Sequence, residues 1–539
     1  MKKRLLAAVL IAMLAMAMAF LSGCGSDNGT DGGRDAGAAA NGNFNTAGFP
    51  IVDEPVTLNV IMERWDLFGD SFLVNPWFDE LEERTNVIID WTLVSGGDWH
   101  EQRTLMMISG DLPDLFLGQG SVNDAMVMTN PQHFIDLTDL VENYMPNYRR
   151  ALELMPAMRQ LTTYPTGGKY SLAFMLPGRP MPLYQPVINM HWLDVVGLAP
   201  PTNTDELLTV LRAFRDNDVN QNGDPNDEFP VTWGADVPRD WFTMFGIVDH
   251  RNTLFNMTGD TPEFWPMSEN YRVAIRFLRG MWEEGLIDPM AFTQDWGTSD
   301  GKIGNYEIPL VGLHFAWAPN GRTGRWYDQH EPIPPIASEF GRFADGDPNG
   351  INALGRNAAH ITSVNPMPEV TARWLDEFYT NEATITNFWG AFGVVLYPNA
   401  DGTFSHMSPP PGQSADLWFW EQSMRDVGPG FADPAWIADH ILFDYTQGDG
   451  RKLMDSRMAD PYVTIPPFPM VLFTTAESEE VAIMGAEIRT FIQQNRANWI
   501  VNGGIDEEWD AYLATLEQLG VPRFIEIHLA ALERFRAAQ

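Results

Sequence analysis

The chain has 539 residues, and its 72 Asp and Glu residues against 34 Lys and Arg residues give a formal net charge of −38 at pH 7. This charge excludes nucleic acid as a partner, because phosphate backbones are bound by basic surfaces, and it disfavours a polyanionic ligand unless arginines cluster locally. With 19 Trp and 32 Phe the chain can bury a large core, and its length exceeds what one hydrophobic core usually serves, so we expect two lobes.

The N-terminus predicts export. Residues 1–23 carry a basic start and a long apolar run, which is typical of a secretory signal peptide, although a single membrane-spanning helix is the alternative for a run of this length. Cys24, the only cysteine, ends a Leu-Ser-Gly-Cys sequence that resembles a bacterial lipobox. That resemblance implies a lipoprotein: cleavage before Cys24, a diacylglyceryl group and palmitate on this residue, and anchoring on the extracytoplasmic face of the cell membrane. Residues 24–50, rich in Gly, Ala, Asn and Asp, would then form a flexible tether.

Strands and helices alternate in the first part of the exported chain. Residues 54–62 alternate apolar and polar side chains and predict a strand, and residues 87–93 predict a second strand after an intervening helix. Another helix, a turn broken by Pro113 and a third strand follow. Such units with short connections predict a parallel α/β sheet, and open sheets of this kind bind ligands beyond the carboxyl ends of their strands.

The middle of the chain predicts amphipathic helices. Residues 204–217 place Leu207, Val210, Leu211 and Phe214 on one face, with Thr204 as a cap. Residues 269–289 predict another helix, which Gly285 and Pro289 end. Residues 308–315 predict a strand, and residues 475–539 are nearly all helical.

Four blocks of sequence carry a resemblance to a known family. They are "SGDLPDLFLG", "HWLDVVGLAPPTNTDELLTVLRAFRDNDVNQNG", "MWEEGLIDPMAF" and "WDAYLATLEQLGVPRFIEIHLAALERF". In this order, behind a lipobox, they resemble the extracellular solute-binding proteins of ABC transporters, in the large lipoprotein branch of the carbohydrate-type group. The resemblance implies an α/β, two-lobe fold like that of periplasmic binding proteins, with a ligand cleft between the lobes and ABC permease subunits as membrane partners.

The resemblance also implies how the chain is divided. Residues 51–168 and 342–410 would form the N-terminal lobe, and residues 169–341 and 411–539 the C-terminal lobe. The chain would cross between lobes near residues 168, 342 and 410, and ligand binding would close them. One departure is Asn189, where family members often carry a basic residue, so an anion contact there is in doubt.

Residues 218–228 form an Asx-rich loop after an amphipathic helix. Oxygen-bearing side chains at positions 1, 3 and 5 and a glycine at position 6 follow the pattern of a calcium loop, although Glu228 falls at position 11 and a strand follows. In the resembling proteins, including alginate-oligosaccharide binders, such a loop holds one structural Ca²⁺. Carried over, this implies as ligands Asp218, Asn220, Asn222, the carbonyl of Asp224, Asp227 and Glu228, with Asn226 as a replacement for Asp227. The alternatives are a solvated turn and a catalytic cluster, for which no nucleophile or acid-base partner is adjacent.

Tryptophans in polar surroundings are the candidate sugar-binding residues. An oligosaccharide offers apolar C–H faces to aromatic rings and hydroxyls to carboxylates and amides. The predicted binding residues are Glu63, Trp65 and Asp66 after the first strand, Trp317 after a later strand, and Trp241, Trp418 and Trp420. For each tryptophan, core or surface packing is the alternative, and Trp192, Trp282 and Trp374 on amphipathic helices are assigned to packing.

Two other functions compete with an oligosaccharide-binding protein. A surface glycoside hydrolase would use two carboxylates, but in a chain with 72 Asp and Glu residues the presence of two nearby carboxylates does not indicate an enzyme. The sequence also holds no HExxH, G-x-S-x-G or P-loop motif. A binder of peptides or another small solute on the same scaffold is the second alternative, because fold does not fix ligand. We therefore expect a monomeric binding protein that is not an enzyme.

Overall fold

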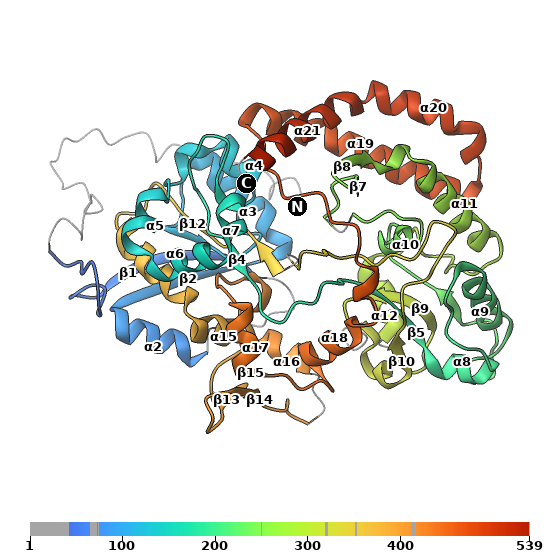
Figure 1. Ribbon diagram of the computed structural model, residues 1–539, viewed down its shortest axis with the longest axis horizontal. Helices are drawn as coiled ribbons and strands as arrows, with labels where there is room; N and C mark the ends of the chain where they lie inside the picture. The colour runs from blue at the N-terminus through green and yellow to red at the C-terminus, as the bar shows by residue number, and fades with distance from the viewer. Residues whose placement is uncertain are drawn as a thin grey trace, which may run out of the picture.

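The computed structural model describes residues 42–64, 73, 75–249, 251–304, 306–318, 322–350, 353–411 and 415–537. The elements group into two lobes, on the left and right of Figure 1, with a smaller layer of helices and short strands beneath the first lobe. In the described part of the chain, no helix is both long and apolar enough to cross a membrane.

The first lobe is built around a four-stranded sheet in the order β12-β3-β1-β2. Strands β1 (Val56–Arg64), β2 (Val87–Ser95) and β3 (Leu115–Leu117) are parallel, as expected, and β12 (Ala359–Ile361) adds an antiparallel edge. The two connecting helices start at side-chain caps, which satisfy free backbone N–H groups: Asn75 caps α2 (Pro76–Thr85) and Ser95 caps α3 (Gly96–Ser109).

Short helices complete this lobe. They are α4 (Asp124–Thr129), η3 (Pro131–His133), α5 (Thr138–Tyr144), α6 (Pro146–Leu154), α7 (Pro156–Thr162), α14 (Pro368–Asp376), η7 (Glu377–Tyr379) and α15 (Asn381–Trp389), with a two-stranded sheet of β4 (Phe174–Met175) and β11 (Leu354–Gly355). Beneath them lie β13 (Leu396–Pro398), β14 (Phe404–His406), α16 (Ala415–Gln422), η8 (Arg425–Val427), α17 (Pro434–His440) and β15 (Ile441–Leu442).

The second lobe has a mixed sheet in the order β10-β5-β9-β6. Its strands are β5 (Gln185–Asn189), β6 (Phe229–Val231), β9 (Val311–Ala316) and β10 (His330–Pro332); β6 runs parallel to β9, and β5 is antiparallel to both β9 and β10. Its other elements are α8 (Met190–Val196), α9 (Thr204–Asp216), α10 (Asp240–Thr243), β7 (Phe255–Thr258), β8 (Thr261–Phe264), η4 (Trp265–Met267), α11 (Glu269–Glu283), α12 (Trp296–Gly304), η5 (Gly324–Gln329), α19 (Thr475–Asn502), α20 (Ile505–Gln518) and α21 (Val521–Ala537).

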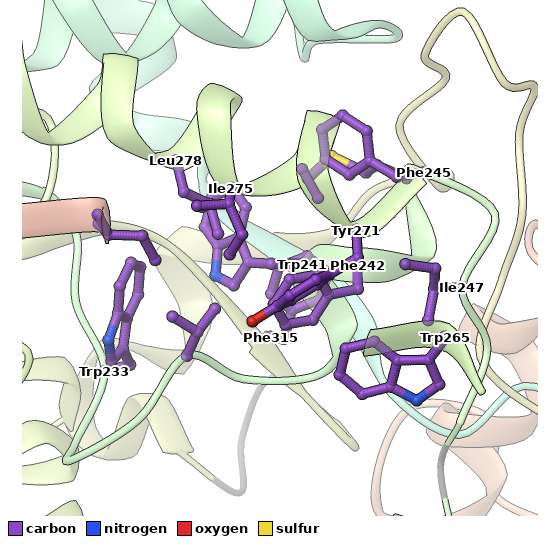
Figure 2. Packing of buried hydrophobic residues seen from close by; sticks show 14 of the residues in the cluster. Trp233, Trp241, Phe242, Phe245, Ile247, Trp265, Tyr271, Ile275, Leu278 and Phe315 are labelled. Atoms are coloured by element: carbon purple, nitrogen blue, oxygen red, sulfur yellow. The ribbon is translucent and has the colours of Figure 1, made fainter. Parts of the chain in front are cut away.

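The core of the second lobe is aromatic. Figure 2 shows Trp233, Trp241 and Phe315 on one side of the cluster and Trp265 and Tyr271 on the other. The helices α19, α20 and α21 close this core from above (Figure 1), and their buried residues belong to the same cluster as those of α11. The expected helical C-terminal section is confirmed, with a Thr474–Glu477 capping box at its start.

Three segments connect the lobes. Residues 176–184 lead from β4 to β5, residues 333–353 return from β10 to β11, and residues 443–473, which contain α18 (Gly448–Ser456) and η9 (Asp460–Tyr462), lead to α19. They run side by side: the Leu183 amide donates to the Asp345 carbonyl at 2.9 Å, and Lys452 Nζ donates to the Leu183 carbonyl at 2.6 Å. These contacts define the crossing region.

The third crossing lies later in the chain than expected. Met424, Val427 and Phe431 pack in the core of the first lobe, and Trp418 packs against α15 residues of the same side. Residues 415–443 therefore belong with the first lobe by packing, whereas the expected division placed 411–539 in the second. The physical reason is packing: Met424, Val427 and Phe431 share a cluster with η7 residues, and the Phe431 amide donates to Thr384 Oγ1 of α15 at 3.1 Å.

Candidate functional site

A cavity of about 650 Å³ opens in the second lobe beside the crossing region. It is built by Tyr184 of the first crossing segment, the loop before α10, the loop before β7, the start of α12 and one face of α19. Its lining residues are Tyr184, Asp236, Val237, Pro238, Arg239, Asp240, Asn252, Leu254, Trp265, Trp296, Asp300, Phe315, Arg322, Arg489, Ile492, Gln493 and Arg496.

Two aromatic rings of the cavity are open to solvent. Trp296 is 48% exposed and Tyr184 is 42% exposed, whereas most large aromatic side chains of this lobe are buried. Trp296 begins α12, and the Arg322 guanidinium lies 5.9 Å from the centre of its ring. Exposed rings in a cavity offer flat apolar surfaces of the kind that stack against a sugar.

Charged side chains stand next to these rings. Arg322 forms an ion pair with Asp300 and also donates to the Phe315 carbonyl at 2.9 Å. On the opposite wall Arg496 lies 3.5 Å from Asp236. Paired arginines and carboxylates present fixed donors and acceptors together, which suits a ligand with many hydroxyl groups.

Asp240 connects the cavity to the crossing region. It lines the cavity and also a small neighbouring space that Asp345 of the second crossing segment lines. Burial, and then the Asp345 carboxylate, raise the pKa of Asp240 to about 7. This carboxyl group therefore changes its charge near neutral pH at the point where the lobes join.

Trp317 is the predicted binding residue nearest to the crossing region. Its partly buried ring has the Arg179 guanidinium at 4.9 Å and Lys452 Nζ at 4.4 Å from its centre. Arg179 pairs with Asp426, and both Arg179 and Arg425 lie over the Phe388 ring, at 5.1 and 4.9 Å. The result is an alternation of aromatic rings and guanidinium groups across the crossing region.

Trp420 extends this alternation, because Arg425 lies 5.6 Å from the centre of its ring. The structure thus brings Trp317 and Trp420 to the two ends of one stack. Neither is among the residues that line the large cavity.

The other predicted tryptophans are less accessible. Trp241 is 2% exposed and packs edge-on against Trp233 and Phe315, as Figure 2 shows from close by, and Trp418 is 7% exposed. In this conformation neither offers a free face for stacking. Trp241 instead supports the cavity from behind, through Phe315.

Glu63 lies near the end of β1 in the first lobe, partly buried, and burial raises its pKa against the opposing effect of Arg103. Trp65, Asp66 and Cys24 lie outside the described residues. The tryptophans assigned to packing are in the cores: Trp192 and Trp374 are buried, and Trp282 packs against the same cluster as Trp192.

The loop 218–228 connects α9 to β6 and folds its oxygens inward. Asp218 accepts from the amides of Asn222 and Gly223, at 3.1 and 2.9 Å, and the side chains of Asn220 and Asn222 donate to Asp227. Gly223, at the sixth position, has a φ of 94°, which disfavours residues with a side chain.

Glu228 lies at the inner end of this loop. Its Oε2 is buried without a hydrogen-bond partner, and burial, with Asp227 and Asp218 adding to it, raises its pKa. A buried carboxylate beside two others needs a compensating positive charge. Among the described residues no group of three or more His, Cys, Asp or Glu side chains is arranged as a metal site, so any ion here would depend on Asn and carbonyl oxygens as well.

Sequence reasoning missed the two exposed rings and the arginines of the cavity. Trp296 stands in the polar sequence "TQDWGTSDG", a context as polar as that of Trp241, and could have been selected by the same criterion. Tyr184, Arg489 and Arg496 carry no local signal, because only the tertiary fold brings the crossing segment and α19 to one cavity.

Comparison with known proteins identifies the class. Residues 69–393 match the model of the bacterial extracellular solute-binding protein family. The fructooligosaccharide ABC transporter substrate-binding protein FusA of Streptococcus pneumoniae is 30% identical over 479 residues, which cover 85% of this chain and 86% of FusA. The polygalacturonan/rhamnogalacturonan-binding protein YtcQ of Bacillus subtilis is 24% identical, covering 84% of this chain and 87% of YtcQ.

The fold agrees with that of a solved relative. The structure of an EF-hand mutant of S. pneumoniae FusA in complex with fructo-nystose superposes with a TM-score of 0.78 at 28% identity, covering 90% of this chain and all of that one. The two-lobe α/β architecture is therefore that of a solute-binding protein. The chain belongs to the bacterial extracellular solute-binding protein family and is an ABC-type carbohydrate solute-binding protein.

Proposed function

We propose that this protein is the membrane-anchored receptor of an ABC importer, and that it captures an oligosaccharide in the cavity of the second lobe. The observation that carries the proposal is the pairing of two solvent-exposed rings, Trp296 and Tyr184, with charged hydrogen-bonding groups in a cavity of about 650 Å³. The named ligands of FusA and YtcQ are both carbohydrates but differ, so the proposal commits to an oligosaccharide and not to one sugar.

The rings and the polar groups have separate roles in this proposal. Trp296 and Tyr184 stack on sugar faces, Asp300 and Asp236 accept hydrogen bonds from hydroxyl groups, and Arg322 donates. Trp317 and Trp420 keep their predicted role as further contacts, reached when the lobes close. Ordered donors and acceptors cost little entropy on binding, which favours affinity.

A glycoside hydrolase is the competing function, and Asp240 is the observation that favours it. A carboxyl group with a pKa of about 7 is suited to act as a general acid. The two other cavity aspartates are engaged with arginines, so we infer binding without turnover. Incubation of the protein with the oligosaccharide that it binds best, followed by chromatography, should show no product; a product lost on Asp240→Asn substitution would establish the enzyme instead.

The anchor is proposed from the sequence around Cys24. Cleavage before Cys24 and lipidation of its thiol would hold the two lobes at the membrane surface through residues 24–50. Mass spectrometry of the membrane fraction should detect a lipid-modified N-terminal peptide beginning at Cys24, and a Cys24→Ala variant should appear unmodified in the medium or periplasm. An unmodified Cys24 in the mature protein would contradict this.

Calcium binding by the loop 218–228 is also proposed. The loop carries the carboxylates of Asp218, Asp227 and Glu228, and Glu228 has a buried oxygen without a partner; carboxylates are the hard oxygen ligands that Ca²⁺ prefers. With Asn220, Asn222 and the carbonyl of Asp224 they would hold the ion, which would offset part of the negative charge of the loop and fix α9 to β6. The solved structure of the FusA relative is that of an EF-hand mutant.

Chelation tests the calcium site. EGTA should lower the melting temperature, and added Ca²⁺ should restore it, because an ion that binds only the folded state stabilises it by about 2.7 kcal/mol at 100 times its Kd. An Asp218→Ala variant should not respond to either treatment, while an exposed control, Asp510→Ala on α20, should respond as the wild type does. If neither treatment changes the melting temperature of the wild type, the loop is a polar turn and not a calcium site.

The function itself is tested by ligand binding. Melting temperature and isothermal titration calorimetry across neutral oligosaccharides, acidic oligosaccharides and short peptides should give a shift and a heat with one glycan class. Heat only with peptides would replace the oligosaccharide by a peptide ligand on the same scaffold.

A further inference from the structure

The large cavity is rich in arginine. Four of its lining residues are arginines, whereas Lys and Arg together make up only 34 of the 539 residues of a chain with a net charge of −38. Three aspartates, Asp236, Asp240 and Asp300, also line the cavity, so it is far less negative than the chain as a whole.

Two of these arginines have carboxylate partners inside the cavity. Arg322 pairs with Asp300, and Arg496 lies near Asp236 and against the rings of Phe242 and Trp265. Their charges are locally compensated. These two arginine–aspartate pairs can form hydrogen bonds with hydroxyl groups, but they leave no surplus positive charge in the cavity.

Arg489 differs from these two. It projects from α19 into the cavity, partly buried, and its one hydrogen bond within the described structure runs from Nη1 to the Asn252 carbonyl, at 2.7 Å. No carboxylate of the described residues lies within ion-pair distance of it. Burial lowers its pKa, and Asp249 opposes this effect only in part.

Asp249 is not available as a partner for Arg489. Its two oxygens accept from the Thr253 amide at 2.8 Å, the Leu254 amide at 2.8 Å and Trp265 Nε1 at 2.9 Å. These bonds hold the loop before β7 in place and occupy both carboxylate oxygens. The charge of Arg489 therefore stays uncompensated on the cavity side.

A second arginine in the same loop is also incompletely partnered. Arg251 precedes Asn252, its Nε is buried without a hydrogen-bond partner, and burial lowers its pKa. Arg251 is not among the residues that line the cavity, and Asp347 and Asp345 oppose the effect of burial on its pKa. Arg489 is therefore the guanidinium that can offer free donors to a planar anion in the cavity.

From this geometry we propose that the oligosaccharide carries a carboxylate, as a uronic acid unit does, and that Arg489 binds it. This inference rests on the proposed function, because it names the class of oligosaccharide for the same cavity. Trp296 and Tyr184 hold the neutral faces of the sugar, and Arg489 selects the charged unit.

The experiment compares acidic oligosaccharides with their carboxyl-reduced counterparts, which keep the linkage and the hydroxyl groups but lose the charge. Titration calorimetry on the purified protein should show that an acidic ligand binds about 10- to 100-fold more tightly than its reduced form, as expected for a charge-assisted hydrogen-bonded pair. This preference should decrease as NaCl is raised.

Substitution of Arg489 distinguishes a role in binding the carboxylate from a role in folding. Arg489→Gln should remove the preference for the acidic form while changing the affinity for the reduced form less than threefold, and Arg489→Lys should retain part of the preference. Arg523→Gln is the matched control, because Arg523 on α21 pairs with Glu480 of α19 outside the cavity; it should bind as the wild type does.

Three outcomes would overturn the inference. If neutral oligosaccharides bind at least as tightly as their acidic counterparts, the carboxylate class is wrong and the proposed oligosaccharide receptor stands. If Arg489→Gln lowers the affinity for the acidic and the reduced ligand equally, Arg489 does not bind the carboxylate. If no glycan binds while peptides do, the proposed function falls and this inference falls with it.

Discussion

At the scale of single residues, exposure separates the tryptophans that we propose to contact a ligand from those that pack in the cores. Trp241 and Trp296 both stand in polar sequence, yet one is 2% and the other 48% exposed. The difference arises because Trp241 packs edge-on against Phe315 in the aromatic core, whereas Trp296 is the first residue of a helix and lines the cavity. The polarity of the surrounding sequence therefore did not predict which of the two side chains is buried and which is exposed.

Replacing Trp296 by alanine should weaken oligosaccharide binding about tenfold, because stacking on an aromatic ring contributes on the order of 1 kcal/mol beyond simple burial. The melting temperature of the free protein should change little, since the ring is half exposed. Titration calorimetry measures the first effect and calorimetric melting the second. Tyr397→Ala, an exposed aromatic on β13 away from the cavity, is the control; equal losses in both variants would contradict the assignment.

Asp240 should make stability depend on pH. Its folded pKa of about 7 exceeds the value of 3.8 for a free aspartate, so between about pH 4 and pH 7 the folded state binds more protons than the unfolded state. The free energy of unfolding should therefore fall as the pH rises from about 4 to about 7. Above pH 7 Asp240 should cause no further loss.

The Asp240→Asn variant should melt at a higher temperature than wild type at pH 8 and at a similar temperature at pH 4. Asp510→Asn, an exposed residue of α20, should show no such divergence. If the melting temperatures of Asp240→Asn and the wild type change in parallel with pH, then burial and Asp345 do not raise the pKa of Asp240.

At the scale of elements, periodicity predicted most of the units, and packing decided their partners. The strand expected at 54–62 is β1 at 56–64, and the helix with Leu207 to Phe214 buried is α9, because these segments carry their periodicity in their own sequence. Short strands such as β12 and β4 have too few residues for a pattern, and the place of residues 415–443 depends on contacts with α15. The cavity was beyond prediction for the same reason: its walls come from segments that are far apart in the sequence.

A buried ion pair fixes α18 to the layer beneath the first lobe. Asp449 accepts from Arg425 at 2.8 Å and from Trp389 Nε1 at 2.7 Å, and both charged groups are buried. Asp449→Ala would leave the Arg425 charge without its carboxylate partner, so it should destabilise the protein by about 3–5 kcal/mol.

Chemical denaturation followed by far-UV circular dichroism measures this loss. Asp510→Ala, in the exposed part of α20, should cost less than about 0.5 kcal/mol. A loss in Asp449→Ala no larger than in this control would mean that the ion pair contributes nothing to the attachment of α18.

At the scale of the whole molecule, we expect the three crossing segments to act as a hinge between the lobes. Their mutual hydrogen bonds keep them together as one unit, and the stack from Trp317 through Arg179 and Phe388 to Arg425 lies across them. Lobe closure would have to rotate the chain about these segments, because each lobe has its own core.

Ligand binding should make the molecule more compact. Small-angle X-ray scattering on a monomeric sample should show a smaller radius of gyration with a saturating, verified oligosaccharide than without it. A variant that does not bind, such as one combining Trp296→Ala and Arg322→Ala, should show no change. An unchanged radius in the wild type would contradict closure on binding.

The interleaving of the chain has a consequence for biosynthesis. The edge strand β12 pairs with β3, and residues 424–431 fill the core of the first lobe, so this lobe stays incomplete until most of the polypeptide has been made. At a synthesis rate of about 5–20 residues per second, roughly 250 residues separate β3 from its partner by about 12–50 s. During that interval the sheet of the first lobe lacks one edge strand, so we expect the lobe to fold late, which would suit a chain that is exported before it folds.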